Sequence, residues 1–451
     1  MNKAPSLNKD AMKNLDKCRV LGVLDDGAAS LSQTALAHLA QAQLVIGGSR
    51  TLELLAEHIA PQAEQRDLTG VMSQVPEWIR AALDEGQRVV VLATGDPLCH
   101  GIAAYLASRL CVEVIEVLPN VSTLQLACAR LCLPWQDMRF VSVHSRDAGE
   151  WVAGSPPSHG LYGLLRELRQ HDRLAVLTSP ANSPDRIARM LVTEGVDKDW
   201  EMAVAERLCQ PQERVLSGFS IEAATQMSFA ELNVVLLWRS TLRASPVLFG
   251  LPDASFAQRH PEKGLITKNE VRAVSLARLQ LRQNSVVWDI GAGSGSVGLE
   301  AARLCTQGHV YAIEKNADDC ANVLQNRRAL GISNHSLVHG KAPDGLVDWA
   351  DPDAVFIGGS GGELAALIGL VLQRLRPGGW LVMNFVTLEN MATAVEAVKQ
   401  LAANWDVLQL QASRSQPILQ MHRMAAENPV WVVCAQAGSA STTSEFVATH
   451  V

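Results

Sequence analysis

The residues best suited to chemistry lie in a glycine-rich turn in the second half of the chain. The apolar run VVWDI contains Asp289, and Gly291, Gly293, Gly295 and Gly298 follow it before a helical pattern begins. Glycines let a backbone adopt positive φ and approach a ligand closely, and a following helix presents free N–H groups. The spacing therefore predicts a strand, a ligand-binding turn and a helix, in that order.

Two ligands could use this turn. Gly293, Gly295 and Gly298 fit the GxGxxG spacing of dinucleotide sites, in which the turn sits against a pyrophosphate. The carboxylate of Asp289 beside a pyrophosphate is unfavourable, whereas S-adenosylmethionine has no phosphate and carries cationic amino and sulfonium groups. Glu314 ends the next apolar run and can bind ribose hydroxyls in either case. The pattern favours the methyl donor over NAD, and a turn with only a structural role is the third alternative.

The runs that follow support the methyl donor. The D-x-G-x-G-x-G turn resembles that of class I methyltransferases, and residues 351–359 and 375–384 resemble the fourth and fifth strands of that family. The resemblance implies a Rossmann-like domain. It also implies that the donor contacts Asp289, Gly291, Gly293, Gly295 and Glu314.

The first half carries a different series of motifs. Gly95-Asp96-Pro97 follows the apolar run RVVVLA, and Ser122-Thr123 opens a later helical pattern. A lone GDP tripeptide is most often a structural turn. The order of the motifs, including His144-Ser145-Arg146, resembles the tetrapyrrole methylase family over most of residues 18–239.

This second resemblance implies a two-lobed α/β domain that holds S-adenosylmethionine between its lobes. By the resemblance, the donor-binding residues are Gly95, Asp96, Pro97, Ser122 and Thr123. One segment departs from the family, because the stretch Val20–Gly27 carries two aspartates where the family has a GxGPG turn. A site that is altered and kept as scaffold is the alternative for this half.

Length and composition indicate a soluble protein of two domains. The 451 residues exceed one ordinary core, 48% are hydrophobic and the formal net charge is −7. Apolar runs alternate with helical patterns, so the predicted fold class is α/β in both halves. We place a tetrapyrrole methylase domain at 18–240 and a class I methyltransferase domain at 250–436, with a turn-rich break between two lobes at 154–160.

Other features exclude several classes of protein. The chain has no apolar run long enough to span a membrane, no secretory signal and no basic excess of the kind that binds nucleic acid. Nine cysteines without a CxxC pair predict neither a disulfide framework nor a metal site, and Cys128 and Cys132 are expected in the core. We therefore expect a cytoplasmic enzyme without membrane or nucleic-acid partners.

A basic segment before the glycine turn could hold an anionic substrate. Between Leu251 and Ser285, six Lys or Arg residues face three acids, a local excess of 6 − 3 = +3. We expect His260 or Glu262 to supply a proton in catalysis, with His260 favoured because imidazole titrates near neutrality. The residues expected to touch substrate, here called the connecting segment, are Arg259, His260, Glu262, Lys263, Thr267 and Lys268.

The pairing of the two families points to the substrate. A tetrapyrrole methylase joined to a class I methyltransferase resembles a bifunctional enzyme of cobalamin synthesis. The resemblance implies methylation of carbons 5 and 15 of precorrin-6B and decarboxylation of the ring C acetate arm, giving precorrin-8X. It implies two S-adenosylmethionine molecules per chain and a homo-oligomer. The alternatives are a methyltransferase acting on RNA or protein with an N-terminal targeting domain, and a protein that senses S-adenosylmethionine.

Overall fold

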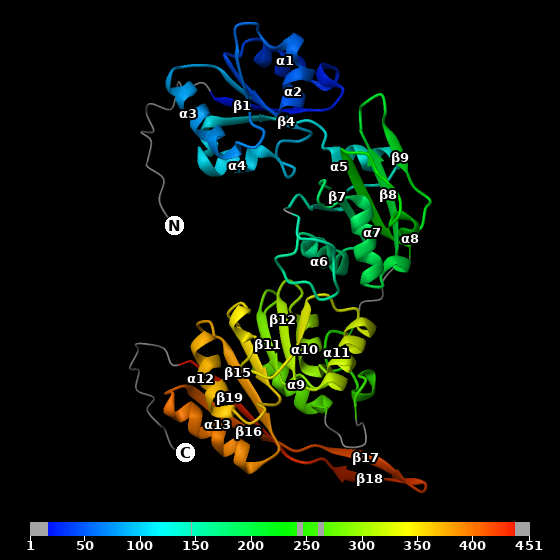
Figure 1. Cartoon of the computed structure of the whole chain (residues 1–451), viewed down its shortest axis with the longest axis vertical. Coiled ribbons are helices and arrows are strands. Elements are labelled where there is room, and N and C mark those ends of the chain that lie inside the picture. The colour runs from blue at the N-terminus through cyan, green and yellow to red at the C-terminus, as the bar shows by residue number, and fades with distance from the viewer. Residues whose placement is uncertain (1–16, 146, 241–246, 260–265, 438–451) are drawn as a thin grey trace. The chain divides into compact units, whose positions relative to one another are not determined.

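The computed structural model describes residues 17–145, 147–240, 247–259 and 266–437. The chain divides into two compact units, which are coloured by residue number in Figure 1. No helix among the described residues is long and apolar enough to cross a membrane. Unit 1 comprises residues 1–149, 171–192 and 196–241, and unit 2 comprises residues 150–170, 193–195 and 242–451.

Unit 1 begins with a parallel five-stranded sheet in the order β3-β2-β4-β1-β5. Helices α1 and α2 cover one face and α3 and α4 the other, so the central strands are buried on both faces. The strands are β1 (Cys18–Val23), β2 (Leu44–Gly47), β3 (Glu64–Asp67), β4 (Val89–Thr94) and β5 (Ile115–Leu118). The helices are α1 (Gln33–Ala40), α2 (Ser49–Leu54), α3 (Val75–Asp84) and α4 (Ile102–Arg109).

The second lobe of unit 1 is a mixed sheet in the order β6-β7-β10-β8-β9. Only the β6–β7 pair is parallel. Helix α5 packs on the sheet through Leu124 and Cys128, whereas Cys132 is exposed because α5 has already ended. The elements are α5 (Thr123–Arg130), β6 (Arg139–Ser142), β7 (Arg173–Leu177), α7 (Pro184–Thr193), β8 (Trp200–Glu206), β9 (Arg214–Leu216), α8 (Ile221–Ala224) and β10 (Asn233–Arg239).

Unit 2 contains a seven-stranded sheet in the order β13-β12-β11-β14-β15-β19-β16. The five strands from β13 to β15 are parallel, and β19 runs antiparallel between β15 and β16. They are β11 (Val286–Ile290), β12 (His309–Glu314), β13 (His335–His339), β14 (Ala354–Ile357), β15 (Trp380–Phe385), β16 (Asn404–Leu410) and β19 (Val430–Gln436). The strand order reverses between β11 and β14, and ligands of open α/β sheets bind at such a switch point.

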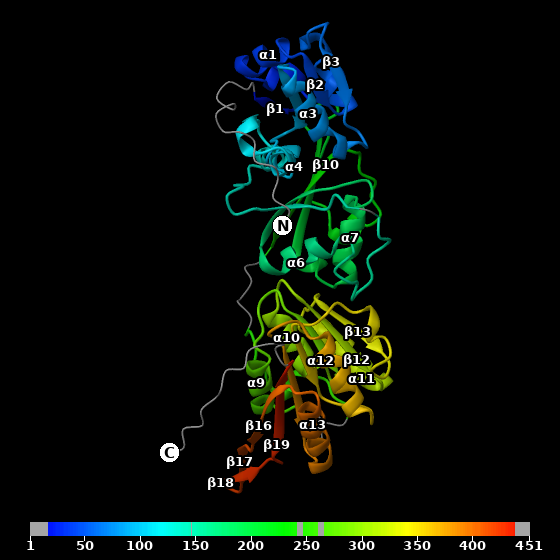
Figure 2. The same ribbon diagram turned by 90° about the vertical axis from the view of Figure 1, so that its left-hand side faces the viewer.

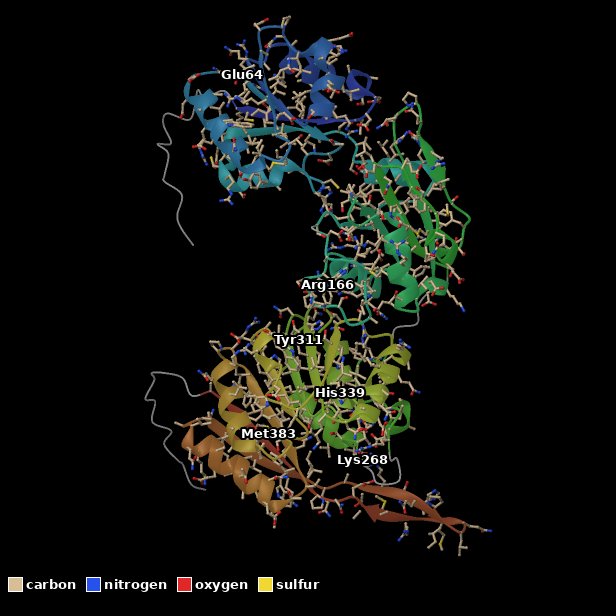
Figure 3. The ribbon with its side chains drawn as sticks, in the orientation of Figure 1. Glu64, Arg166, Lys268, Tyr311, His339 and Met383 are labelled. Atoms are coloured by element: carbon tan, nitrogen blue, oxygen red, sulfur yellow. The ribbon has the colours of Figure 1, made fainter. Side chains whose placement is uncertain are left out.

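Helices cover both faces of this sheet. Helices α9 and α10 pack on one face, and α12 and α13 pack on the other, where Met383 of β15 is buried (Figure 3). A separate hairpin of β17 (Ser413–Ile418) and β18 (Met421–Ala426) follows β16, as the turned view of Figure 2 also shows. The helices are α9 (Asn269–Arg278), α10 (Ser296–Leu304), α11 (Ala317–Ala329), α12 (Leu364–Arg374) and α13 (Leu388–Gln400).

The turn-rich segment at 154–160 does not separate two lobes, so that prediction is wrong. It lies between β6 and helix α6 (Tyr162–Gln170), both of which come before β7 of the second sheet. Residues 150–170 belong to unit 2, where the Tyr162 hydroxyl lies 2.6 Å from Nδ1 of His309. The turn residues indicated a loop correctly, but long-range packing decides which elements the loop joins.

A buried ion pair helps to hold residues 150–170 within unit 2. Glu194 lies 3.5 Å from Arg327 and accepts a 2.9 Å hydrogen bond from the indole of Trp151. Both charged side chains are about 95% buried. Burial lowers the pKa of Arg327, and the charge of Glu194 opposes that shift.

Glu194→Gln is expected to lower the free energy of unfolding of unit 2 by about 3 kcal/mol, because it leaves the buried Arg327 cation without its counter-charge. The amide oxygen can still accept from Trp151, so packing is preserved. Urea denaturation measures the change. Glu64→Gln, at an exposed position in β3, is the control, and equal stability of the two variants would contradict the role given to Glu194.

Candidate active sites

The glycine turn of unit 2 lies at the switch point of its sheet. Strand β11 ends at Ile290 and α10 begins at Ser296. Gly291 has φ of +71°, and a Cβ there would lie 2.5 Å from the carbonyl oxygen of Gly359, which follows β14. Gly295 caps α10 with φ of +76°. The turn therefore needs glycine at 291 for close approach of two backbones as well as for conformation.

Asp289 places a buried carboxylate under this turn. The residue is 1% exposed, and its Oδ2 accepts a 3.0 Å hydrogen bond from the backbone N–H of Gly298. Its Oδ1 is buried and has no hydrogen-bond partner among the described residues. Burial, and then the nearby charge of Glu314, raise the pKa of Asp289 to about 7. A cationic ligand group at Oδ1 would stabilise the ionised carboxylate.

Glu314 lies at the end of β12 and faces the same turn. Its Oε2 accepts from the N–H of Gly293 and its Oε1 from the N–H of Asn316, both at 2.9 Å. Each carboxylate oxygen can accept a further hydrogen bond. Two carboxylates at one turn disfavour a pyrophosphate. The geometry therefore suits a cationic nucleoside without phosphate, as the sequence predicted.

The structure describes only half of the predicted connecting segment. Arg259 forms a 3.3 Å ion pair with Asp319, and its side chain is 32% exposed. Lys268 is the N-cap residue of α9, and the carbonyl of Thr267 accepts a 2.6 Å hydrogen bond from Arg272. His260, Glu262 and Lys263 lie outside the described residues.

The predicted excess of positive charge is partly neutralised within unit 2. Arg272 is fully buried and forms ion pairs with Asp253 at 3.2 Å and with Glu300 at 3.3 Å. Arg278 forms an ion pair with Asp406. Arg272 is thus a structural cation, because its guanidinium holds residues 251–253 against α9 and α10. The described cations of this region that reach its surface are Arg259, Lys268, Arg278 and Arg282.

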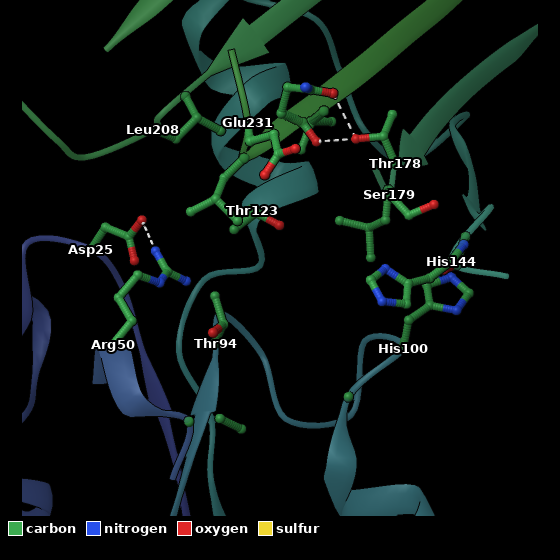
Figure 4. A pocket seen from close by; sticks show the side chains of 18 of the residues that line it. Asp25, Arg50, Thr94, His100, Thr123, His144, Thr178, Ser179, Leu208 and Glu231 are labelled. Atoms are coloured by element: carbon green, nitrogen blue, oxygen red, sulfur yellow. Dashed lines mark hydrogen bonds and ion pairs between the residues drawn. The ribbon is translucent and has the colours of Figure 1, made fainter. Parts of the chain in front are cut away.

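Unit 1 contains a cavity of about 650 Å³ lined by residues of both lobes (Figure 4). The first lobe supplies Asp25, Arg50 and His100, and the second supplies His144 and Glu231. Apolar side chains such as Leu92, Leu126, Leu177 and Phe229 form much of the remaining wall. A hollow of this size between two lobes can hold a nucleoside and part of a larger ring.

The predicted donor-binding residues of unit 1 lie at or beside this cavity, and Gly95, Asp96, Pro97 and Ser122 do not belong to its lining. Thr123 lines it directly. Ser122 caps α5 by accepting from the N–H of Gln125, and Oδ1 of Asp96 accepts from the N–H of Leu98 at 2.8 Å. Gly95 has φ of +67° and donates its N–H to Val23. These contacts fix the conformation of the two turns.

The altered Val20–Gly27 stretch also contributes to the cavity. Packing in this stretch requires glycine at position 22, because a Cβ there would lie 2.4 Å from the carbonyl oxygen of Gly95. Asp25 forms an ion pair with Arg50 and accepts from the side chain of Gln210 at 2.5 Å. The aspartate that departs from the family pattern is thus part of the cavity wall. Sequence reasoning missed Arg50 and His100.

The described residues contain no group of three or more His, Cys, Asp or Glu that could hold a metal ion. Each unit instead combines a glycine-dependent turn at the end of a parallel strand with polar groups suited to a small ligand.

Comparisons with known proteins match both halves. Residues 18–223 match the tetrapyrrole (corrin/porphyrin) methylases, and residues 258–435 match the precorrin methyltransferase domain. The chain is therefore a methyltransferase that joins a tetrapyrrole methylase domain to a precorrin methyltransferase domain. A precorrin-6Y C(5,15)-methyltransferase (decarboxylating) from a Sinorhizobium species is 33% identical over 404 residues, which cover 88% of this chain and 91% of that protein. The chain belongs to the family of precorrin-6Y C(5,15)-methyltransferases (decarboxylating).

Other relatives match one part of the chain. The cobalt-precorrin-6B C(15)-methyltransferase (decarboxylating) of Salmonella typhimurium is 40% identical over 172 residues, 38% of this chain and 88% of that protein. A crystal structure of a precorrin-6Y C5,15-methyltransferase from Geobacter metallireducens is 38% identical with a TM-score of 0.40, and covers 42% of this chain and 97% of that chain.

Proposed function

We propose that this chain methylates carbons 5 and 15 of precorrin-6B and removes the carboxyl group of the ring C acetate arm, giving precorrin-8X. Membership of the family and the presence of two differently built sites in one chain support this proposal. The observation that carries it is the pairing of the Asp289–Glu314 turn in unit 2 with the two-lobed cavity in unit 1. An RNA or protein methyltransferase would not require two such sites.

The two activities are assigned to different units. The Salmonella relative is named for carbon 15 and decarboxylation, and the 172 matched residues are close to the length of the second domain. Unit 2 accordingly carries out methylation at carbon 15 and decarboxylation, and unit 1 methylates carbon 5. Each meso carbon is itself the nucleophile, so the protein mainly positions two reactants and excludes water.

S-adenosylmethionine fits the residues at both sites, with one molecule in each unit. When bound, it supplies an electrophilic methyl group at its sulfonium. In unit 2, Oδ1 of Asp289 is free to accept from the ligand's ammonium group, and Glu314 can accept from ribose hydroxyls. In unit 1, Thr123 on the cavity wall and the neighbouring turn at Gly95–Pro97 would bind the donor.

The connecting segment is proposed to bind and protonate the substrate. Arg259, Lys263, Thr267 and Lys268 would bind its carboxylates, and His260 would supply the proton that replaces the lost carboxyl group, with Glu262 as the alternative acid. His260→Ala is expected to slow carbon dioxide release by roughly 100-fold, because a general acid typically contributes a rate factor of at least this size. Donor binding should stay unchanged. Glu262→Gln tests the alternative acid, and carbon dioxide release at the wild-type rate in His260→Ala would refute the role given to His260.

The product and its stoichiometry test the whole proposal. Incubation of the purified chain with precorrin-6B and the methyl donor should give a product heavier by two methyl groups and lighter by one carbon dioxide, measured by mass spectrometry. Calorimetry should find two S-adenosylhomocysteine sites per chain. One site, or a single methyl gained, would mean that one unit has only a structural role.

The remaining parts of the proposal concern the cell. We infer that the protein acts as a homo-oligomer in the cytoplasm, without nucleic-acid or membrane partners. Light scattering of the purified chain measures its oligomeric state. Fractionation of the source cells tests its location.

A further inference from the structure

The cavity of unit 1 holds two imidazoles that the proposed function has not used. His100 lies in the loop between β4 and α4, and His144 follows β6 in the other lobe. Neither imidazole has a hydrogen-bond partner among the described residues. In the view of Figure 4, both lie at one end of the cavity and the Asp25–Arg50 pair lies at the other.

The loop around His100 is tightly fixed. The N–H of Cys99 donates to the carbonyl of Asp96 at 3.1 Å, and a Cβ on Gly101 would lie 2.3 Å from the carbonyl oxygen of Pro97. His100 itself has φ of +55°, a left-handed conformation that a non-glycine residue rarely adopts. Such strain persists where the surrounding structure imposes it, and it clusters at functional sites.

Methylation of a meso carbon needs a proton acceptor. The carbon gives an electron pair to the new carbon–carbon bond, while the donor's sulfur keeps the pair of the bond that breaks. The carbon–hydrogen bond then breaks, its electron pair returns to the macrocycle, and the proton must leave. A base at the cavity wall can accept that proton directly, and imidazole is suited to this near neutral pH.

Resting on the proposed function, we propose that His100 accepts the proton released from carbon 5. Three features favour it over the other groups of the wall. It lies three residues after the Gly95–Pro97 turn, so the same loop places the donor and the base. Asp25 is already engaged by Arg50 and Gln210. In Figure 4, Glu231 lies away from the two imidazoles.

The replacement His100→Asn tests this assignment without forcing the backbone, because asparagine tolerates positive φ better than most residues. The comparison variant is His144→Asn, which removes the other imidazole of the same cavity and so tests which of the two accepts the proton. We expect His100→Asn to slow carbon 5 methylation in a single turnover by roughly 100- to 1,000-fold, within the usual range for a general base. Methylation at carbon 15 and carbon dioxide release should stay unchanged, as should calorimetric binding of S-adenosylhomocysteine.

A second measurement needs no methyl donor. With precorrin-6B and S-adenosylhomocysteine in heavy water, the wild-type chain should speed deuterium exchange at carbon 5, detected by NMR, and His100→Asn should not. Carbon 5 methylation at the wild-type rate in His100→Asn, or its loss in His144→Asn alone, would overturn the assignment while leaving the proposed function intact. A wild-type chain that leaves carbon 5 unmethylated would overturn both.

Discussion

Asp289→Asn is expected to weaken S-adenosylhomocysteine binding at the unit 2 site by roughly 10- to 100-fold, which corresponds to one charged hydrogen bond of about 1.5–3 kcal/mol. The asparagine oxygen can still accept from the N–H of Gly298, so the turn keeps its shape. What is lost is the negative charge and the unpartnered Oδ1. Calorimetry should show one weakened site and one unchanged site, and an unchanged pair of sites would exclude Asp289 from donor binding.

The same substitution should stabilise the ligand-free protein. Burial, and secondarily Glu314, raise the pKa of Asp289 from 3.8 in the unfolded chain to about 7 in the fold. A carboxyl whose folded pKa is raised contributes stability that is complete below the unfolded pKa and is lost as pH rises through the folded pKa. The wild-type chain should therefore lose stability from about pH 4 to beyond pH 7 relative to Asp289→Asn. Urea denaturation across that range measures it, and parallel stability curves would contradict the raised pKa.

Ligand binding should show the opposite dependence on pH. A cationic ligand favours the ionised carboxylate, so affinity at the unit 2 site should fall in the wild type as pH drops below 7, by up to about tenfold for each pH unit, until it reaches the affinity of Asp289→Asn. In Asp289→Asn that dependence should disappear. A site that weakens on acidification in both proteins would indicate that another group titrates.

The sequence predicted those strands in which consecutive apolar residues are by themselves enough to indicate a buried strand. Val286–Ile290, His309–Glu314 and Trp380–Phe385 are mostly apolar and mostly buried, because helices cover the sheet on both sides. The edge strand Glu64–Asp67 was missed because all four of its side chains are polar. The hairpin of Ser413–Ile418 and Met421–Ala426 was missed as well, since its exposed residues show no alternation of polar and apolar types.

The residues of the candidate sites also fall into two groups, those that the sequence could predict and those that only the folded structure shows. The glycine turn and Asp289 could be predicted because strand, turn and helix are consecutive in the chain. Arg50 could not, because its role depends on an ion pair with Asp25, which comes from a different loop. His100 gave no sequence signal either, since only the folded loop places it on the cavity wall.

The largest effects are expected from two glycine substitutions, each of which should abolish one activity. In Gly291→Ala, the new methyl group would lie 2.5 Å from the carbonyl oxygen and 2.7 Å from the nitrogen of Gly359, both of them backbone atoms that cannot move aside alone. Overpacking typically destabilises by about 1–3 kcal/mol, and a left-handed conformation adds about 1–2 kcal/mol. The turn should open, with loss of carbon 15 methylation and decarboxylation and retention of carbon 5 methylation.

Gly22→Ala should give the converse result. Its methyl group would lie 2.4 Å from the carbonyl oxygen of Gly95 and 2.7 Å from the nitrogen of Asn120, so it should push apart the two segments to which we assign donor binding in unit 1. Carbon 5 methylation should be lost while carbon 15 methylation and carbon dioxide release continue, which mass spectrometry of the product resolves.

Matched control variants distinguish the effect of the steric clash from the effect of replacing a glycine that has positive φ. A Cβ at Gly378 or Gly70 would meet nothing within 4 Å, although both have positive φ, of +78° and +76°. Alanine there should cause only the strain of the left-handed backbone, so both activities should remain measurable. If Gly291→Ala and Gly22→Ala each abolish both activities in a folded chain, the two units do not act separately, because a clash confined to one turn would then disable both sites.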